Sequence, residues 1–566
     1  MEKKMLDYIE KNNLSPFNKT KTSVNAKETI FKTKDAKSVY NKVISAINSN
    51  FYFADTSNLL TCFPFTPDFE EIKNRQDFFK SIAKNIDNEF LKKISVPKSS
   101  WKPNYDAVIV TENEKNLSKL QEFGCTVKFI ATENDIAYLE RYDLVYVVDC
   151  DQFSNFLESL PQAIFVNNLE DAYLERYLIL LSSWQENFEV LMNNNFEQET
   201  IKELLSILNL VRSKTEILSK EKIFEELENI NEKIFSQIKT MTVSGESLLS
   251  ILKKGIPCEL KEIINSEISK TKIPSHLFSI SIPLEVDERE LDNFIKRQNT
   301  SEFTDKSAIL KQNSKSLKSA PEKLKKISAE LLIFDFISGI SNFISSFENY
   351  PKHAEELKFT NSKNIFLENA QPVCFNLNNE HKCSILTGAN SGGKTTLLEH
   401  IIQLVTLSQI GLPVSGNLNL PIFNQVYYFA KNKGSMSKGA FETLLTQMSQ
   451  INPEGKTLIL ADEIESVTEP GVAGNIISAT AEYFISKDCF LVIATHLGFE
   501  IQKSLPKGAR IDGIEAKGLD DNFELIVDHN PVIGRLAHST PELIVEKMAN
   551  SFKTDYFNFI FKKLKS

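Results

Sequence analysis

No stretch of this 566-residue sequence comes near the ~20 consecutive apolar residues that a helix needs to cross a bilayer. The opening residues, from Met1 to Tyr8, carry charges where a signal peptide requires an apolar segment. We therefore expect a cytoplasmic location and no membrane partner.

Paired cysteines and a basic excess are also missing. The seven cysteines are scattered singly, with neither C-x-x-C spacing nor histidine clusters beside them, which predicts reduced, mostly buried thiols and argues against structural zinc. The formal net charge is −10 at pH 7. This charge argues against a protein coated in nucleic-acid-binding surface, so any such contact must come from local basic patches.

The strongest positive signal is a glycine-rich segment. Residues 388–395 fit the pattern G-x-x-x-x-G-K-[ST], after a short apolar strand at 384–387 and before apolar residues at helical spacing in 396–410. Glycines let backbone N–H groups point at phosphate oxygens, and the helix directs its positive end at the same anion. The alternative is a glycine-rich turn that only joins a strand to a helix.

This segment predicts an ATP site with Mg²⁺. Lys394 should reach the β- and γ-phosphates, and Thr395 should ligate the metal. The candidate nucleotide-binding residues of the loop are Gly388, Asn390, Ser391, Gly392, Gly393, Lys394, Thr395 and Thr396.

Two further apolar strands end in polar residues. The strand at 457–461 runs into Asp462 and Glu463, and the strand at 490–495 ends at His496. At the carboxyl end of a parallel sheet, Asp462 can hold Mg²⁺ through water while Glu463 polarises the attacking water. His496 would lie near the γ-phosphate as a second catalytic candidate; alone, it would be interpreted as a hydrogen-bonded histidine at a strand end.

About the last two hundred residues hold a series of short motifs. In chain order they are Gly388–Thr396 with Asn390 and paired Gly392-Gly393, Gln409–Leu412, Ser437–Glu442, Asp462-Glu463, Glu469–Gly471, Ala494–His496, Gly534–Ala537 and Ser539–Glu546. Their order resembles an ABC-type ATPase and, more narrowly, the MutS family of DNA mismatch-repair and recombination ATPases.

The resemblance implies a homodimer that forms through its ATPase domains. In such sites the signature loop of one subunit completes the phosphate site of the other, so Ser437 and Gly439 would act in trans. It also implies an ATP-switched clamp on double-stranded or branched DNA in repair or recombination, in a nucleoid-associated protein. The alternative is an SMC-like or generic ABC-type ATPase that binds protein partners, and a third possibility is a structural protein with an inactive nucleotide site.

A chain of this length predicts several domains, so we expect a multidomain α/β protein. We predict an N-terminal segment that begins a helical core (1–103), a small parallel α/β domain (104–168), helical levers with a short clamp-like insertion at about 256–320 (169–350), and an ABC-type P-loop ATPase domain with C-terminal dimerisation helices (351–566).

Two lysine-rich segments are candidates for DNA contact. Residues 306–326 hold seven lysines against Glu322 alone, next to the predicted clamp, and are the preferred candidate. Residues 19–42 also hold seven lysines, against Glu28 and Asp35, and are interpreted first as a solvated face.

A mismatch-reading device is not evident. Mismatch-reading members of the family carry a Phe-x-Glu wedge; Phe156-Leu-Glu158 and Phe366-Leu-Glu368 match the letters but not the context. The chain therefore resembles the short MutS homologues without a mismatch reader, of the kind found among archaea, and we expect no nuclease tail. Ala389, Ser391 and Glu465–Val467 depart from the classical pattern and put a role in mismatch repair in doubt.

Overall fold

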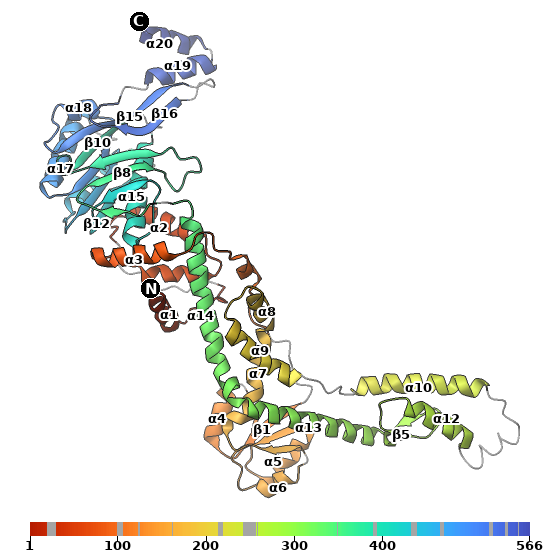
Figure 1. The fold of residues 1–566 in the computed structure, drawn as a ribbon. Coiled ribbons are helices and arrows are strands. Elements are labelled where there is room, and N and C mark those ends of the chain that lie inside the picture. The colour runs from red at the N-terminus through yellow and green to blue at the C-terminus, as the bar shows by residue number, and fades with distance from the viewer. Residues whose placement is uncertain are drawn as a thin grey trace. The chain divides into compact units, whose positions relative to one another are not determined.

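The computed structural model describes residues 1–19, 30–98, 106–122, 125–160, 162–212, 219–240, 256, 258–347, 349–388, 393–431, 438–463, 469–519, 525–537, 541–552 and 554–565. Two compact units divide the chain (Figure 1). Unit 1 combines Met1–Lys92 with Ser328–Ser566, and unit 2 is Lys93–Ile327.

A six-stranded sheet forms the centre of unit 1. Its strand order is β12-β13-β14-β10-β15-β16, parallel except for the antiparallel pair β15 and β16. The strands are β10 (Cys383–Gly388), β12 (Gln425–Phe429), β13 (Thr457–Asp462), β14 (Phe490–Ala494), β15 (Ala509–Leu519) and β16 (Leu525–Val532). The central strands β13 and β14 are largely apolar because both of their faces are covered.

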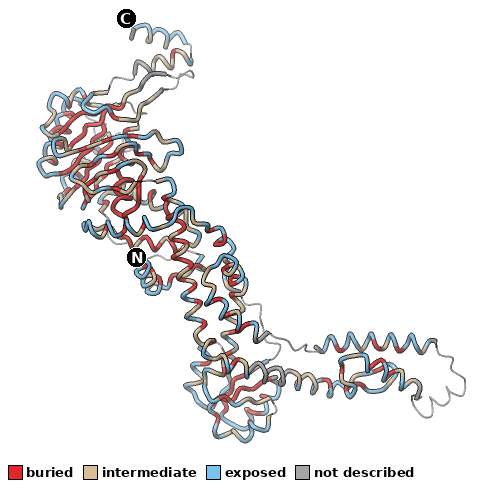
Figure 2. Tube along the Cα trace, viewed as in Figure 1, coloured by how far each residue is buried: buried red, intermediate tan, exposed pale blue. Residues whose placement is uncertain are grey.

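Helices cover the two faces of this sheet. Alternate strand residues such as Leu458 and Leu460 join the cluster that contains α15 (Lys394–Ile410), whereas Ile459 and Ala461 join the cluster that contains α17 (Pro470–Ser486) and α18 (Gly498–Gln502). Figure 2 shows the buried residues concentrated along these strands.

Smaller elements complete the C-terminal part of unit 1. A second sheet has the order β7-β11-β8-β9, in which β8 runs antiparallel to β9 and β11. The remaining elements are β7 (Lys352–His353), β8 (Leu357–Ser362), β9 (Val373–Leu377), β11 (Asn417–Leu420), α16 (Lys438–Ser449), α19 (Pro541–Phe552) and α20 (Asp555–Lys565).

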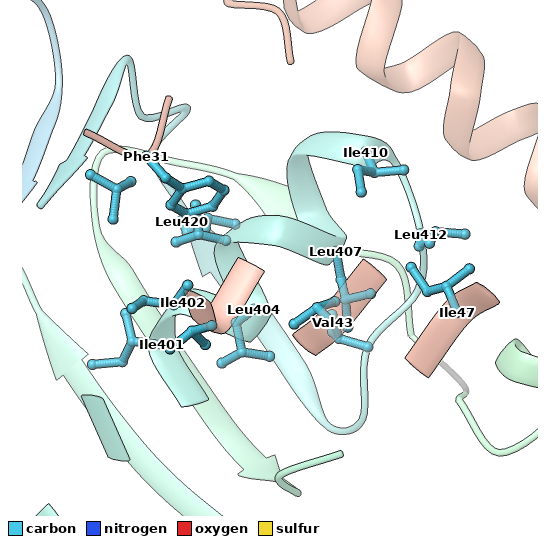
Figure 3. Packing of buried hydrophobic residues seen from close by; sticks show 14 of the residues in the cluster. Phe31, Val43, Ile47, Ile401, Ile402, Leu404, Leu407, Ile410, Leu412 and Leu420 are labelled. Atoms are coloured by element: carbon cyan, nitrogen blue, oxygen red, sulfur yellow. The ribbon is translucent and has the colours of Figure 1, made fainter. Parts of the chain in front are cut away.

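The N-terminal segment packs with these C-terminal elements. It contains α1 (Glu2–Lys11), α2 (Lys34–Asn48), α3 (Phe69–Ser81) and the 3-10 helices η1 (Ala54–Cys62) and η2 (Glu89–Lys93). Val43 and Ile47 of α2 lie among Leu404, Leu407 and Ile410 of α15 in one hydrophobic cluster (Figure 3). Unit 1 thus joins residues 1–92 to the residues from 328 onward. The predicted domain boundaries, including that of the N-terminal segment 1–103, stay predictions.

The long helix α14 (Ser314–Ile344) contributes its C-terminal part to unit 1. Asp335 on this helix is fully buried and accepts hydrogen bonds from the backbone N–H groups of Tyr52 and Phe53 and from the Thr56 hydroxyl. Among the described residues, α14 is the one helix long and apolar enough to span a membrane by length and composition, and 67% of its apolar window is buried inside the protein. Burial in the core therefore accounts for its composition.

Unit 2 begins with the predicted parallel α/β element. The four apolar runs form β1 (Ala107–Thr111), β2 (Val127–Phe129), β3 (Leu144–Val147) and β4 (Ala163–Phe165), in the order β2-β1-β3-β4, and every pair is parallel. Short helices connect them: α4 (Glu114–Glu122), α5 (Glu133–Ala137), η3 (Tyr138–Arg141) and α6 (Ser154–Glu158). The predicted mixed α/β class with parallel sheets and many helices is confirmed.

Helices make up most of the rest of unit 2. They are η4 (Leu169–Tyr173), α7 (Leu174–Ser183), α8 (Gln185–Asn193), α9 (Gln198–Arg212), α10 (Lys220–Thr240), α12 (Cys258–Ser269), η5 (Ser275–Leu277) and α13 (Glu288–Gln312), followed by the first part of α14. Within the predicted clamp-like insertion, β5 (Phe278–Ser279) pairs antiparallel with β6 (Glu285–Val286). One hydrophobic cluster joins α10, α12, these strands and α13.

Candidate nucleotide-binding site

Three neighbouring parallel strands bring the predicted site residues to one edge of the main sheet. Ala494 at the end of β14 lies opposite both Asp462 of β13 and Leu386 of β10, so the three carboxyl ends are level. This edge is where α/β sheets bind ligands. The structure therefore brings together Gly388, Lys394, Asp462 and the residues that follow them.

Lys394 begins α15 and is 3% exposed. Its Nζ donates a hydrogen bond to the Gly388 carbonyl oxygen at 2.7 Å and lies 3.3 Å from Nε2 of His496. It also lies 3.9 Å from Oε1 of Glu463. The buried ammonium is thus held at the place where the strand turns into the loop.

Thr395 and Asp462 form the predicted metal pair. Oγ1 of Thr395 donates to Oδ2 of Asp462 at 2.5 Å, while the buried Oδ1 of Asp462 has no hydrogen-bond partner among the described residues. Burial raises the pKa of the Asp462 carboxyl, although the Thr395 hydrogen bond acts against this shift. A buried carboxylate oxygen without a partner, beside a hydroxyl, fits a hydrated Mg²⁺, which binds through oxygen ligands and keeps several waters.

Glu463 has an uncommon backbone conformation, with φ of +49°. Its N–H donates to the Ala494 carbonyl at 2.9 Å, which ties it to the neighbouring strand. A non-glycine residue with positive φ is rare and concentrates at functional sites. This conformation turns the side chain toward His496, whose Nε2 lies 2.8 Å from Oε1 of Glu463.

Lys431 is a residue that the motifs do not contain. It follows β12, and its Nζ pairs with Oε2 of Glu463. Burial of Glu463 raises the pKa of its carboxyl, but the hydrogen bonds from Lys431 and His496 outweigh burial and hold the pKa below its ordinary value. Glu463 is therefore a carboxylate at neutral pH, as a residue that orients and activates water must be.

Two loop glycines occupy positions where no side chain fits. Gly388 has φ of +139°, and a Cβ there would lie 2.4 Å from the Ile514 carbonyl oxygen. Gly393 has φ of +91° and precedes α15 as its N-cap, and a Cβ would lie 2.9 Å from Nδ1 of His529. The backbone can therefore approach a ligand closely at the positive end of the helix.

Several predicted residues lie outside the described part of the chain: Asn390, Ser391, Gly392 and Ser437. Gly439 is in the first turn of α16, and Thr396 is in the first turn of α15. Their roles stay predictions.

A small pocket of about 80 Å³ opens beside the loop, and sequence reasoning missed it. It is lined by Gly393 and Thr396 on one side and by Gln371, Val373, His400 and His529, among others. The lining is mostly apolar, which suits a flat ring next to the phosphates. No motif marks Gln371, Val373 and His529, because they lie on strands and loops far from the glycine-rich segment in the sequence.

Buried polar groups hold one wall of this pocket. His400 is 2% exposed, with Nε2 2.9 Å from the Ser362 hydroxyl and Nδ1 3.3 Å from Oε1 of Gln403, and burial lowers the pKa of His400 to about 4. Nε2 of Gln403 donates to Oδ1 of Asn364, another lining residue, at 2.9 Å. The wall is therefore neutral and fixed at physiological pH.

The tail motif 534–537 packs against the loop strand. The Gly534 N–H donates to Oδ1 of Asp512 at 2.9 Å, and the Ala537 N–H donates to Oγ1 of Thr387 at 3.1 Å. Asp512 also accepts a 2.6 Å hydrogen bond from Ser384 of β10. The tail thus braces the strand that leads into the glycine loop.

The preferred lysine segment is partly engaged within unit 2. Lys318 pairs with Glu170 at 2.9 Å and Lys323 pairs with Glu203 at 2.6 Å. Lys311 and Lys315 are exposed. Internal ion pairs therefore reduce the number of lysines that this segment can offer to DNA.

No protein-family model matches the chain. The DNA-binding protein MutS2 of Pyrococcus furiosus is 31% identical over 94% of this chain and 99% of that protein. The chain belongs to the MutS family. Two bacterial relatives are the endonuclease MutS2 of Lactobacillus acidophilus, 24% identical over 33% of this chain and 25% of that protein, and the DNA mismatch repair protein MutS of Fervidobacterium nodosum, 26% identical over 33% and 24%.

These similarities confirm the MutS resemblance. They favour it over an SMC-like protein, because a MutS2 protein of nearly equal length matches almost the whole chain and not the ATPase region alone. MutS family members are ATPases.

Proposed function

We propose that this MutS family protein binds and hydrolyses ATP with Mg²⁺ at the edge formed by β10, β13 and β14, and that the nucleotide switches its grip on DNA in repair or recombination. The observation that carries the proposal is the convergence of Lys394, Thr395, Asp462, Glu463 and His496 at three level strand ends. Two further observations support it. Oδ1 of Asp462 has no hydrogen-bond partner among the described residues, and the absence of a Cβ at Gly393 lets a ligand come close to the backbone there.

Each residue has a distinct task in this proposal. Lys394 binds the β- and γ-phosphates, and Thr395 with Asp462 holds the hydrated metal, which when bound neutralises phosphate charge. Glu463 accepts a hydrogen bond from the attacking water and takes its proton, and His496 orients the Glu463 carboxylate at 2.8 Å. The pocket between Thr396 and His529 receives the base.

DNA as the partner is supported by the relatives. The P. furiosus protein is named as DNA-binding and the F. nodosum protein as a mismatch-repair protein. Endonuclease activity is not part of the proposal, because the similarity to L. acidophilus endonuclease MutS2 spans only 25% of that protein. The cytoplasmic, nucleoid-associated location remains a prediction.

We also propose a homodimer through the ATPase units. On α20, Tyr556 and Phe559 are 67% and 64% exposed, and Phe552 at the end of α19 is 64% exposed. Exposed aromatic side chains grouped on one helical hairpin are typical of an interface. A partner subunit there would allow Ser437 and Gly439 to complete the nucleotide site in trans, as the family geometry implies.

The test of the ATPase compares two variants with a matched control. Glu463→Gln should still bind ATP but hydrolyse it about 10²-fold or more slowly, because water loses its base. Lys394→Ala should weaken ATP binding, and Glu380→Gln, an exposed glutamate of unit 1, should leave both unchanged. Hydrolysis by Glu463→Gln at the wild-type rate would show that the base is wrongly assigned.

A further inference from the structure

The outward face of α2 carries a lysine cluster that no motif of the nucleotide site uses. Lys34, Lys37, Ser38, Asn41, Lys42 and Ser45 line one shallow depression. Their spacing of three and four residues places them on a single helical face. Val39 on the opposite face is buried, and Val43 and Ile47 of that face pack against α15 (Figure 3).

Two of these lysines lie where the helix dipole disfavours a positive charge. Lys34 and Lys37 lie in the first turn of α2, beside its positive end, where cations are unfavourable. In the described part of the chain, no carboxylate forms an ion pair with either of them; Lys42 lies 3.8 Å from Glu399. Cations without an ion-pair partner at a helix N-terminus destabilise the isolated protein. Binding of an anion offsets this repulsion.

The acidic residue of this segment is turned inward. Oδ2 of Asp35 accepts a hydrogen bond from the Ala430 N–H at 3.0 Å, and the Thr33 hydroxyl donates to the Tyr428 carbonyl at 2.7 Å. Residues 32–45 therefore present four lysines outward, and their single acid is bound at the end of β12. The outward face of α2 is therefore basic, and hydrogen bonds fix the start of the helix to β12 of unit 1.

The clamp-like insertion has no basic excess. Residues 256–320 contain ten Lys or Arg and ten Asp or Glu, so their net charge is zero. Nucleic-acid affinity comes largely from phosphate neutralisation, so this insertion is a poor source of it. In an acidic chain the binding energy must come from local basic faces, and α2 offers one of them.

We propose that the α2 face is a docking surface for the phosphate backbone of duplex DNA. The proposal deepens the proposed function and rests on it. Lys34 and Lys42 are eight residues apart, about 12 Å along a helix, which matches the rise of three to four phosphates on one strand. Ser38, Asn41 and Ser45 add uncharged donors of the kind that contact phosphate oxygens without reading sequence.

The experiment measures duplex binding by the full-length protein at a series of salt concentrations. Lys34→Glu/Lys37→Glu should reduce the log–log salt slope by about 1.8, which is ~0.9 for each of two lost phosphate contacts. Lys34→Gln/Lys37→Gln should reduce it equally without adding repulsion. Lys503→Glu/Lys507→Glu changes two exposed lysines elsewhere in unit 1 and should leave the slope unchanged.

The outcomes separate this proposal from the one on which it rests. If the wild type binds duplex and both α2 variants keep its slope, the α2 face is not the contact, whereas DNA binding itself stands. If the wild type shows no salt-dependent duplex binding, the proposed function fails first. An equal fall in the Lys503/Lys507 variant would show a general charge effect. Binding of polyglutamate more tightly than duplex at the same salt concentration, lost in both α2 variants while duplex binding is unchanged, would assign the face to an acidic protein instead.

Discussion

Gly393 offers a quantitative test of the nucleotide site. The residue has φ of +91° and stands at the N-cap of α15. Gly393→Ala would place a Cβ 2.9 Å from Nδ1 of His529, well inside the 3.5 to 4.0 Å of an ordinary contact. The left-handed backbone costs an alanine about 1–2 kcal/mol as well.

Both effects are relieved by movement at the site. Either the first turn of α15 rotates or His529 shifts into the pocket that it lines. ATP binding must then restore the original geometry. Most of the strain of about 1–2 kcal/mol therefore makes the free energy of ATP binding less favourable. The expected result is a loss of roughly five- to thirty-fold in affinity.

Gly508→Ala is the matched control. Gly508 also has positive φ, +89°, and precedes β15 at the end of the strand remote from the loop, where a Cβ would lie 3.2 Å from the Cγ2 methyl of Ile485. The backbone strain is similar, so both variants should unfold at a lower temperature, and only Gly393→Ala should bind ATP weakly. Titration of a fluorescent ATP analogue with Mg²⁺ in a Glu463→Gln background gives the affinity without turnover. Wild-type affinity in Gly393→Ala would refute the placement of phosphate at the start of α15.

Three other predictions concern pH, assembly and mismatches. Lys431→Met removes an ammonium group that lowers the pKa of Glu463, so burial should raise that pKa. The acid limb of the pH–rate profile, measured in steady-state ATPase assays, should therefore move to higher pH. An unmoved limb would show that Lys431 does not act on the general base. Tyr556→Ser/Phe559→Ser should shift sedimentation toward the monomer, whereas Tyr138→Ser, an equally exposed tyrosine of unit 2, should not. A single mismatch should not increase duplex affinity at fixed salt, because Phe156 lies on helix α6 of the small α/β element rather than on a wedge loop; a clear preference over the matched duplex would reveal an unrecognised wedge.

The sequence predicted well those parts of the fold that depend on residues close together in the chain. Residues 383–396, 457–463 and 490–496 each combine an apolar strand with the polar residues that follow it, so periodicity and motif spacing located them and parallel pairing brought them together. The same holds for the four strands of the small α/β element.

The parts that the sequence did not predict depend on contacts between distant segments. Nothing near Arg75 indicates that it is fully buried and donates to the Pro64 carbonyl at 2.6 Å and to the Gln409 carbonyl, 334 residues away, at 3.4 Å. His529 and Gln371 meet at the pocket for the same reason. Lys431 is one exposed lysine among many until the fold places it beside Glu463.

The assembly of unit 1 from two distant stretches has a consequence for synthesis on the ribosome. Phe31, just before α2, bridges to Val426, 395 residues later, so this segment cannot pair with β12 until that strand has emerged. At about 5–20 residues per second, the interval is roughly 20–80 s. All of unit 2 is made during this time. Nascent chains interrupted before α15, which begins at Lys394, would expose the Val39 and Val43 face of α2, which makes them substrates for chaperones and proteases rather than nucleotide-binding proteins.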